Sequence, residues 1–398
     1  MNKPERIAIV GGGIGGLTAA IALLQRGIDV DVYEQAPVLG ETGAGVQISA
    51  NGTRVLIALG LEQDLLDVCF MPTGKEIRLW STGTTWTPFD LGAASLERYG
   101  APYVTLHRAD LHELLAHAVR RLKRDAITLG ARCIDIRQSS AGVVLHFANG
   151  SMAQAQGAVG ADGVHSRVRQ LLFDNDVATF TGCVAWRGVV PAHRLPAGLL
   201  RPVGTNWIGP GRHFVNYPLR RGELLNFVGI VERQDWRIES WSAQGTADEC
   251  LRDFKGWHRD IQAIIASVAT PYKWALMARE PMAQWSLGRV TLLGDACHPT
   301  LPFLAQGAVM AIEDAYVLAR AVEMFGDCTL AFERYEAARR PRTSAIVKGS
   351  AANTRRFHNE RLSDVSTAQE YINTEWSEAR VRERYEWLFT YDATTVEI

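Results

Sequence analysis

The sequence predicts an α/β fold in which a mainly parallel, helix-flanked sheet is interrupted by a β-rich domain and followed by a helical tail. Three observations lead to this prediction. A glycine-rich turn joins an apolar strand to an apolar helix near the start of the chain. Short strand-like segments, rich in tryptophan and separated by Gly and Pro, fill residues 176–285. An apolar strand at 290–293, followed by Gly-Asp and then a helix, resumes the first pattern.

These changes of pattern set the expected domain boundaries. The first part of the α/β domain covers 1–175, and the inserted domain covers 176–285. The second part of the α/β domain covers 286–345, and the helical tail covers 346–398. Residues near 76–100 are expected to add to the sheet of the inserted domain.

The first elements form a predicted βαβ unit. A buried strand at 6–10 leads through the glycine-rich turn to an apolar helix at 17–25, which Gly27 ends. A second strand at 29–33 closes on Glu34.

The remaining elements follow from apolar spacing and from turn residues. We expect helices at 51–59 (ended by Gly60), 111–124 and 306–322, a hairpin of strands 133–136 and 143–147, and strands at 184–190, 213–217 and 224–231. After Glu333 the chain is charged and helical, and Pro341 is expected to break that helix.

Composition describes an ordinary globular protein. The 398 residues carry a net charge of -1 and are 47% hydrophobic, which points to no nucleic-acid or anionic-membrane partner. The six cysteines include no CxxC pair, so we expect reduced thiols, no metal site and a cytoplasmic location. No signal peptide and no apolar span of about 20 residues is seen, so integral membrane association is not expected.

The motif GGGIGG at 11–16 lies between a strand and a helix. Glycines at Gly11, Gly13 and Gly16 would let the backbone approach a pyrophosphate, and the helix N-terminus would offer N–H groups to it. Glu34, at the end of the next strand, could accept hydrogen bonds from ribose hydroxyls. The alternative is a tight turn without a ligand.

The motif GDACHP at 294–299 follows a second apolar strand. The Asp295 carboxylate could hold a polyol hydroxyl of a cofactor, and the helix that starts near Gly307 would direct its N-terminus at the same place. That dipole would stabilise a reduced, negatively charged flavin. The alternative is that Asp295 only caps a turn.

These motifs together resemble a known family. GGGIGG at 11–16, GADGVHSRVR at 160–169, GDACHP at 294–299 and YEAARRPR at 335–342 resemble the signature set of single-component FAD-dependent aromatic hydroxylases. The resemblance covers residues 1–345 well and the rest loosely. It is strongest to the salicylate hydroxylase, 3-hydroxybenzoate 6-hydroxylase and 6-hydroxynicotinate 3-monooxygenase group.

The resemblance implies a Rossmann-like FAD-binding domain, an inserted β-sheet-rich substrate domain and a role in the catabolism of aromatic compounds. FAD would be the cofactor, with NADH or NADPH as cosubstrate. The second domain offers only GPG at 209–211, without a following helix, so no separate nicotinamide domain is expected. The implied FAD contacts are Gly11, Gly13, Gly16, Glu34, Gln35, Arg108, Asp162, Asp295, Gly307 and Ala308.

Within that set, the resemblance places Arg108 at the FAD phosphate or ribityl region and Asp162 in contact with both FAD and NAD(P)H. Asp295 would bind the ribityl chain, with Gly307 and Ala308 at the isoalloxazine ring. From the residues alone, Arg108 could be a surface cation and Asp162 an ordinary turn residue.

The implied reaction begins with reduction of FAD by NAD(P)H, and molecular oxygen then gives a flavin hydroperoxide. A ring carrying an ionised hydroxyl attacks that oxygen donor, so the site must exclude water and favour the phenolate. His213 and Tyr217 are the candidates for catalysis because residues four apart in a strand face the same side. His213 would take the phenol proton and Tyr217 would orient the substrate. Structural roles for both remain the alternative.

Several positions depart from parts of that group. Gln47 stands where the 6-hydroxynicotinate enzymes carry a histidine, and the loop TLP at 300–302 lacks the glutamine of the 3-hydroxybenzoate enzymes. Pro302 is closer to the salicylate type. No arginine is an evident carboxylate clamp, although Arg187 and Arg220 are candidates.

The sequence therefore predicts hydroxylation of a small aromatic acid by molecular oxygen, with salicylate-type chemistry first and the 3-hydroxybenzoate and 6-hydroxynicotinate activities as alternatives. Other classes are a non-catalytic FAD-binding protein, a flavin halogenase, whose Trp-x-Trp-x-Ile-Pro motif is absent, and a reductase or epoxidase acting on a membrane lipid. A nucleophilic pair of Cys297 and His298 is not expected, since adjacent turn residues rarely bring their functional atoms together. A homodimer is the candidate assembly, and the sequence does not fix the oligomeric state.

Overall fold

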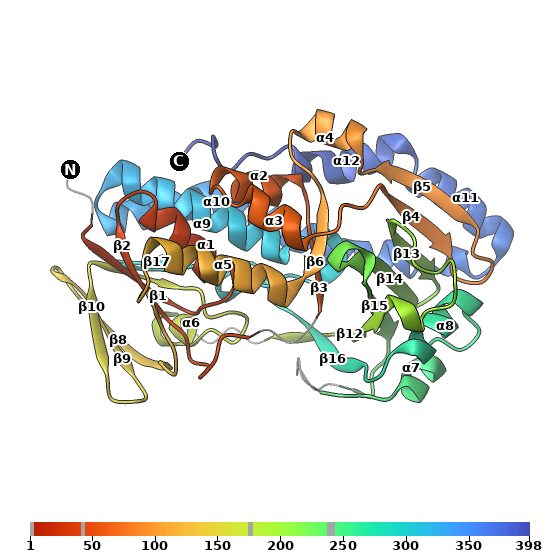
Figure 1. Ribbon diagram of the computed structural model, residues 1–398, viewed down its shortest axis with the longest axis horizontal. Helices are drawn as coiled ribbons and strands as arrows, with labels where there is room; N and C mark the ends of the chain where they lie inside the picture. Colours follow the sequence, from red (N-terminus) through yellow and green to blue (C-terminus); the bar gives the residue numbers. More distant parts are fainter. Residues whose placement is uncertain (1–3, 41–43, 174–177, 237–242) are drawn as a thin grey trace.

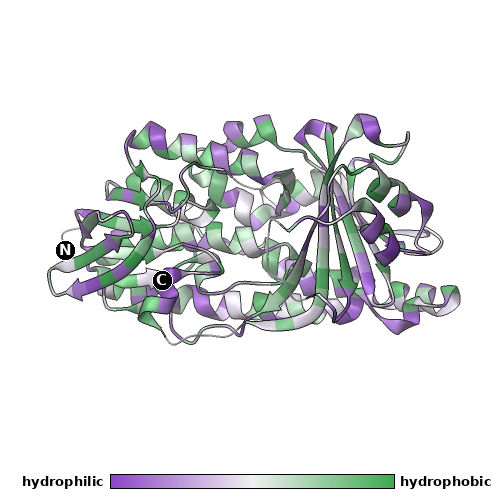
Figure 2. Ribbon diagram, turned by 90° about the horizontal axis from the view of Figure 1, so that it is seen from below, coloured by the Kyte–Doolittle hydropathy of each residue, from purple (hydrophilic) through white to green (hydrophobic). Residues whose placement is uncertain are grey.

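The computed structural model describes residues 4–40, 44–173, 178–236 and 243–398. Two large sheets lie at opposite ends of an elongated molecule, and long helices run between them (Figure 1). Figure 2 shows hydrophobic stretches along the strands of both ends. In the described ranges, no helix has the length and apolar character needed to cross a membrane.

The first sheet is six-stranded and mainly parallel, in the order β17-β18-β11-β1-β2-β7. Its strands are β1 (Arg6–Val10), β2 (Asp29–Tyr33), β7 (Ile127–Thr128), β11 (Gly157–Gly160), β17 (Ser286–Leu287) and β18 (Val290–Leu292). Only β17 pairs antiparallel, at the edge. The order confirms that strands far apart in the sequence join one sheet.

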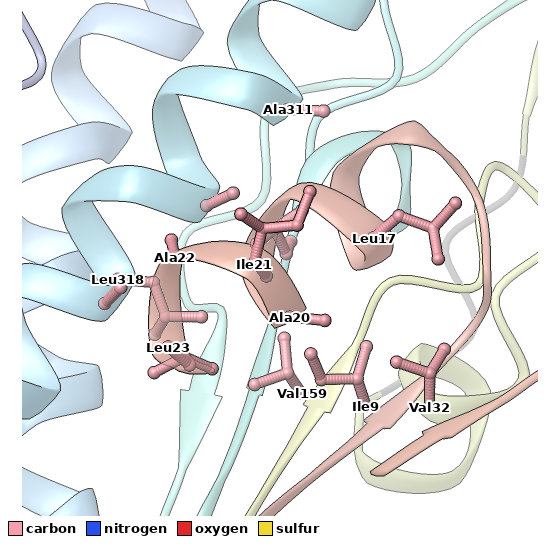
Figure 3. Close-up of a cluster of buried hydrophobic side chains, with 14 of the residues drawn as sticks. Ile9, Leu17, Ala20, Ile21, Ala22, Leu23, Val32, Val159, Ala311 and Leu318 are labelled. Carbon is pink, nitrogen blue, oxygen red and sulfur yellow. The ribbon is translucent and has the colours of Figure 1, made fainter. Parts of the chain in front are cut away.

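Helices α1 (Ile14–Leu24), α5 (Arg108–Leu122) and α9 (Gly307–Phe325) accompany this sheet. Figure 3 shows Ile9, Val32 and Val159 of the strands beneath α1, with Ala311 and Leu318 of α9 beside it. Small side chains let α1 and α9 approach closely, since a methyl group at Gly15 would lie 3.1 Å from the Ala311 methyl carbon.

The second sheet is seven-stranded, in the order β16-β12-β15-β14-β13-β4-β5. Its strands are β4 (Gly74–Leu79), β5 (Thr85–Asp90), β12 (Thr179–Pro191), β13 (Val203–Gly209), β14 (Arg212–Leu219), β15 (Leu224–Glu232) and β16 (Tyr272–Ala278). One face carries Trp186, Trp207, Phe214 and Phe227, which form a core with helices α7 (Ala247–Asp253) and α8 (Arg259–Ser267). The other face is turned toward the part of the molecule that contains the six-stranded sheet.

Smaller elements complete the fold, and three of the strands form a separate sheet at the end that holds the six-stranded sheet (Figure 1). The smaller elements are strands β3 (Gly45–Ile48), β6 (Val104–His107), β8 (Cys133–Ser139), β9 (Gly142–Phe147) and β10 (Met152–Ala155), and helices α2 (Ala50–Ala58), α3 (Glu62–Val68), α4 (Ala93–Tyr99) and α6 (Arg167–Leu172). Short 3₁₀ turns lie at η1 (Ala192–Arg194), η2 (Arg220–Gly222), η3 (Gly294–Ala296), η4 (Pro302–Leu304) and η5 (Glu360–Leu362). The predicted hairpin is confirmed, since β8 and β9 pair antiparallel.

The predicted break at Pro341 is wrong, because α10 (Cys328–Phe357) runs through it. A proline inside a helix costs about 3 kcal/mol or more. The buried face of α10, which includes Tyr335, Arg339 and Ile346, packs and forms ion pairs on both sides of this position, and that offsets the cost. Helices α11 (Val365–Glu375) and α12 (Glu378–Phe389) then lie beside β4 and β5 (Figure 1).

Candidate active site

The three glycine and aspartate motifs meet at the carboxyl ends of β1, β11 and β18. Gly11 has φ +109°, and a methyl group there would lie 2.4 Å from the carbonyl oxygen of Ala161. Arg169, from the second motif, donates from Nη1 to the carbonyl oxygen of Ala296 in the third, at 2.8 Å. Because neighbouring parallel strands end at one sheet edge, motifs that lie far apart in the sequence, at 11–16, 160–169 and 294–299, form one surface.

The glycine-rich turn leaves the N-terminus of α1 open. Gly13 is the N-cap residue and no side chain caps the helix. A methyl group at Gly13 would have no atom within 4 Å, whereas one at Gly16 would lie 2.0 Å from the Gly11 carbonyl oxygen. The turn is thus tight on its inner side and open in front of the helix, which is the geometry that a pyrophosphate requires.

Glu34 holds this turn from the next strand. Its Oε2 accepts from the Gly12 N–H at 2.7 Å, and its Oε1 accepts from the Ala36 N–H at 2.8 Å. Each carboxylate oxygen retains a lone pair that could accept from a ribose hydroxyl. Gln35 is exposed beside it.

A buried histidine that the sequence analysis missed supports the same turn. His112 of α5 forms a hydrogen bond from Nε2 to the Gly12 carbonyl oxygen at 2.7 Å. One of two histidines in a leucine-rich helix gives no sequence signal of such a contact, since its partner lies 100 residues away.

Asp162 caps α6. Its Oδ1 accepts from the Ser166 hydroxyl at 2.5 Å, and its Oδ2 accepts from the N–H groups of Arg167 and Val168 at 2.7 and 3.0 Å. Burial raises the pKa of Asp162, against these hydrogen bonds. The carboxylate therefore fixes the loop beside Gly11, and its contact with FAD or NAD(P)H remains a prediction.

The third motif places Asp295 near Arg108 and Gly307. Burial raises the pKa of Asp295, while the charges of His298 and Arg108 oppose the increase. A methyl group at Gly307 would lie 4.0 Å from Asp295 Oδ1. Within the described ranges, no group donates a hydrogen bond to the Asp295 carboxylate. A hydroxyl-rich chain would supply those donors, so these residues fit the ribityl part of FAD.

The start of α9 is held by a buried polar network. Gln306, its N-cap residue, donates to the Ser49 hydroxyl and accepts from Asn51, both at 3.0 Å. Asn51 also donates to Glu313 at 2.7 Å. Ala308, the second helical residue, is half-buried. The helix N-terminus is thereby fixed next to Asp295.

The same network pairs the acidic residues of α9 with arginines of α10. Arg339 binds Glu313 at 2.6 Å and Asp314 at 2.7 Å, and Arg342 binds Glu313 at 2.9 Å. His298 lies 2.5 Å from Asp314. Burial opposes ionisation of Glu313, but Arg342 and Arg339 outweigh it and lower its pKa. This explains why ED in α9 and RRPR in α10 occur together in one sequence.

Cys297 is inert as a nucleophile here. The thiol is fully buried, its pKa is raised well above the usual range by burial, and it lies 3.3 Å from the Gly294 carbonyl oxygen. His298 is directed to Asp314 and not to this thiol.

The second sheet presents His213 and Tyr217 on the face opposite these loops. His213 is 2% exposed, and its ring meets Phe303, which precedes α9, at 5.2 Å between centroids. A methyl group at Gly45 of β3 would lie 2.7 Å from Tyr217 Cε2. The two predicted residues thus approach the loops of the other sheet from one strand.

A polar row extends from Tyr217 across the same face. Lys75 donates from Nζ to the Tyr103 hydroxyl at 3.2 Å, and that hydroxyl donates to Gln47 Oε1 at 2.7 Å. The Gln47 side chain also faces the Tyr217 hydroxyl. Burial lowers the pKa of Lys75, and within the described ranges no carboxylate lies within 4.0 Å of its Nζ. The sequence analysis missed Lys75 and Tyr103, because only strand pairing shows which face they share.

The two arginines proposed as carboxylate clamps differ. Arg220 lies on η2 and forms a two-pronged ion pair with Asp110, at 2.7 and 2.8 Å, so its charge is already compensated. Arg187 is buried on the site-facing side of β12 and lies over the rings of Tyr272 and Trp274. Arg187 remains a candidate for an anion contact.

His213 also belongs to a chain of side chains that leads away from this face. Its Nδ1 lies 2.7 Å from Nε2 of His358, and Nδ1 of His358 lies 2.7 Å from Glu232 Oε1. Burial, with a smaller contribution from His358, lowers the pKa of His213 well below its usual value. The imidazole of His213 is therefore neutral at physiological pH.

Comparison with known proteins gives consistent results. A family described as an FAD binding domain matches residues 5–350. The chain is 38% identical to 3-amino-4-hydroxybenzoate 2-monooxygenase PtnB3 of Streptomyces platensis, over 98% of this chain and 97% of the relative. It is 37% identical to 6-hydroxynicotinate 3-monooxygenase of Pseudomonas fluorescens, over 89% and 92%. A salicylate hydroxylase substrate complex superposes with a TM-score of 0.80 at 26% identity, over 98% and 96%.

Proposed function

Because the chain belongs to the FAD binding domain family, we propose that it hydroxylates a small aromatic carboxylate whose ring carries a hydroxyl group. One observation carries this proposal. A neutral His213 and an uncompensated Lys75 lie on the same sheet face, opposite the loops that fit FAD. The neutral imidazole could accept the proton of a ring hydroxyl, and the ammonium group could bind the carboxylate.

The coarse activity is settled by the relatives. The chain is an FAD-dependent aromatic-ring monooxygenase, with NAD(P)H as the electron donor typical of the family. Bound FAD would supply the redox chemistry. Transfer of oxygen from a flavin hydroperoxide remains a prediction. The residues proposed to hold FAD are those of the Gly11 turn, Glu34, Arg108, Asp295 and the start of α9.

His213 is proposed to take the proton of the ring hydroxyl. Its low pKa keeps the imidazole unprotonated, so a ring nitrogen is free to accept. The resulting ring oxyanion is electron-rich and reacts more readily with an electrophilic oxygen donor. Phe303 and Phe357 pack against the imidazole, at 5.2 and 4.9 Å between centroids, and exclude water from it.

Lys75, with Tyr103, Gln47 and Tyr217, is proposed to bind the substrate carboxylate. The hydroxyls and the ammonium group are donors that a carboxylate accepts. A partly buried lysine without an acidic partner is costly in the free protein, and an anionic substrate would compensate its charge.

The spacing of the two ends bears on which acid is bound. His213 and Tyr217 are four residues apart in β14, or about 13 Å along the strand. Because the two side chains rise from one face at this backbone spacing, an aromatic acid whose hydroxyl and carboxylate lie on opposite sides of the ring would direct one group toward each of them. This supports acids of the type named by the two relatives, 6-hydroxynicotinate and 3-amino-4-hydroxybenzoate. Salicylate, in which the two groups are neighbours and carbon dioxide leaves, is the second candidate, favoured by Pro302.

A product-based assay tests this proposal. The purified protein should be yellow, and its NAD(P)H oxidation should accelerate with 6-hydroxynicotinate or 3-amino-4-hydroxybenzoate and yield a hydroxylated ring. Products should be scored directly, because aromatic acids can stimulate NAD(P)H oxidation without being hydroxylated. A colourless protein, or a yellow one that forms no product from these acids, 3-hydroxybenzoate or salicylate, would refute it.

A further inference from the structure

We propose that His358 and Glu232 connect His213 to solvent as a proton relay for the ring hydroxyl, an inference that rests on the proposed function. The three side chains form one continuous hydrogen-bonded line. His213 Nδ1 lies 2.7 Å from His358 Nε2, and His358 Nδ1 lies 2.7 Å from Glu232 Oε1. The Glu232 side chain is 52% exposed, whereas that of His358 is 2% exposed, so the line starts in the core and ends in water.

The order of donors and acceptors along this line determines the tautomers. The Glu232 carboxylate can only accept, so His358 carries a proton on Nδ1, and a neutral His358 then presents an unprotonated Nε2 to His213. His213 must then carry its own proton on Nδ1. Its Nε2 is left unprotonated, which is the state that a base for the ring hydroxyl requires.

The surroundings of His213 make a relay necessary. The rings of Phe303, from η4, and Phe357, from the end of α10, pack against the imidazole and keep water away. The titratable groups along the path are His358, the C-cap residue of α10, and Glu232, the last residue of β15. The His358 hydrogen bond lowers the pKa of Glu232, which stays ionised at neutral pH.

The proton balance of the relay is closed. The O–H bond of the ring hydroxyl breaks and an N–H bond forms at His213 Nε2. The Nδ1 proton of His213 moves to His358 Nε2, and the Nδ1 proton of His358 moves to Glu232 and from there to water. After hydroxylation, the reverse sequence returns one proton to the product oxygen and restores both tautomers. His358 and Glu232 act through His213 and are positioning residues.

The backbone holds this arrangement in register. The His358 carbonyl oxygen accepts from the Gly211 N–H at 3.3 Å, and the Gly211 carbonyl oxygen accepts from the Glu232 N–H at 3.0 Å. The hairpin tip between β13 and β14 is thereby fixed to the end of α10. The helix end and the two strands carry the three side chains as one unit.

The test compares His358→Gln and Glu232→Gln with Glu223→Gln, which replaces an exposed carboxylate at the other end of β15. The first readout is imidazole ¹⁵N NMR of the FAD-loaded protein without substrate, which should show the His213 proton on Nδ1. The second is the absorbance of bound 6-hydroxynicotinate or 3-amino-4-hydroxybenzoate against pH, which reports ionisation of the ring hydroxyl. The third is coupled product formation.

His358→Gln should raise the pH at which the bound ring ionises and lower coupled turnover about 100-fold, the lower end of what general acid–base catalysis contributes. Glu232→Gln should also raise the ionisation pH of the bound ring and lower coupled turnover, each by a smaller factor. The FAD content and the rate of FAD reduction by NAD(P)H should stay unchanged. Since Glu232 is half exposed, that variant reports on the relay even if His358→Gln folds poorly.

The outcomes separate the relay from the proposed function. If the wild-type protein forms no product from either probe, the proposed function fails and the relay with it. If the wild type forms product and His213→Ala uncouples it, but both relay variants behave like Glu223→Gln, only the relay is refuted. A His213 proton found on Nε2 also refutes it.

Discussion

Replacement of Lys75 by methionine should weaken substrate binding and stabilise the protein at the same time. Methionine is similar in length and removes only the charge and the donor. The ammonium group now donates to Tyr103 at 3.2 Å and lacks a carboxylate partner within the described ranges. A hydrogen bond to a charged group contributes about 1.5–3 kcal/mol. At 1.36 kcal/mol per factor of ten, Lys75→Met should raise the KM for the aromatic acid about 10- to 150-fold.

The stability effect has the opposite sign and depends on pH. Burial lowers the pKa of Lys75, so folding disfavours its protonated form. That penalty is fully present below the folded-state pKa and disappears as pH rises through the ordinary lysine value of about 10.4, where both states are neutral. The free energy of unfolding of Lys75→Met should therefore exceed that of the wild type at neutral pH, with the difference shrinking toward pH 11.

Lys273 provides the matched control. It is a buried lysine on the opposite face of the same sheet, and it is compensated by Glu249 at 3.7 Å and by the Trp236 ring at 3.8 Å. Lys273→Met should leave KM unchanged and lower the free energy of unfolding. Urea unfolding gives the free energy of unfolding of both variants, and steady-state kinetics gives their KM. Unchanged KM in Lys75→Met, or a loss of stability as large as that of Lys273→Met, would contradict the argument.

Three further predictions concern the cofactor surface and its support. Gly11→Ala should not bind FAD, because its methyl group would meet the Ala161 carbonyl oxygen at 2.4 Å. Gly13→Ala should fold normally and still lose FAD affinity. The FAD content and the melting temperature of the two variants test this. Asp295→Ala should keep its melting temperature but lose FAD or slow its reduction, and a full FAD content with an unchanged reduction rate would count against it. Arg339→Met should cost about 3–5 kcal/mol in urea unfolding, because it leaves Glu313 and Asp314 buried without this partner, whereas Arg380→Met, in an exposed pair with Glu383, should cost at most about 1 kcal/mol.

The features that the sequence predicts well are those encoded within a few residues. The turn at Gly11 needs a positive φ and a close approach of backbones, and only glycine meets both requirements. The alternation that places His213 and Tyr217 on one face is likewise local. Pro341 shows the limit of this reasoning, because packing and ion pairs of the whole helix outweigh the local preference of one residue.

What the sequence does not reveal is set by contacts between distant segments. His358 meets His213 across 145 residues, and His112 meets Gly12 across 100. Lys75 joins the candidate site only because β4 pairs in parallel with β13, which places it in the row of Gly204 and Tyr217. Strand order in a mixed sheet depends on the whole chain, so no pattern within β4 could identify Lys75 as a site residue.

Compensation of buried charge separates the residues that support the structure from those proposed to meet ligands. Glu313 and Asp314 are buried and paired with arginines, so the protein alone satisfies them. Asp295 and Lys75 are a partly buried acid and base without such pairing within the described ranges, and burial shifts the pKa of each toward its neutral form. An unpaired buried charge destabilises a fold, and its retention on two facing surfaces is best explained by ligands that compensate it. The polyol of FAD would meet the first charge, and the carboxylate of the substrate would meet the second.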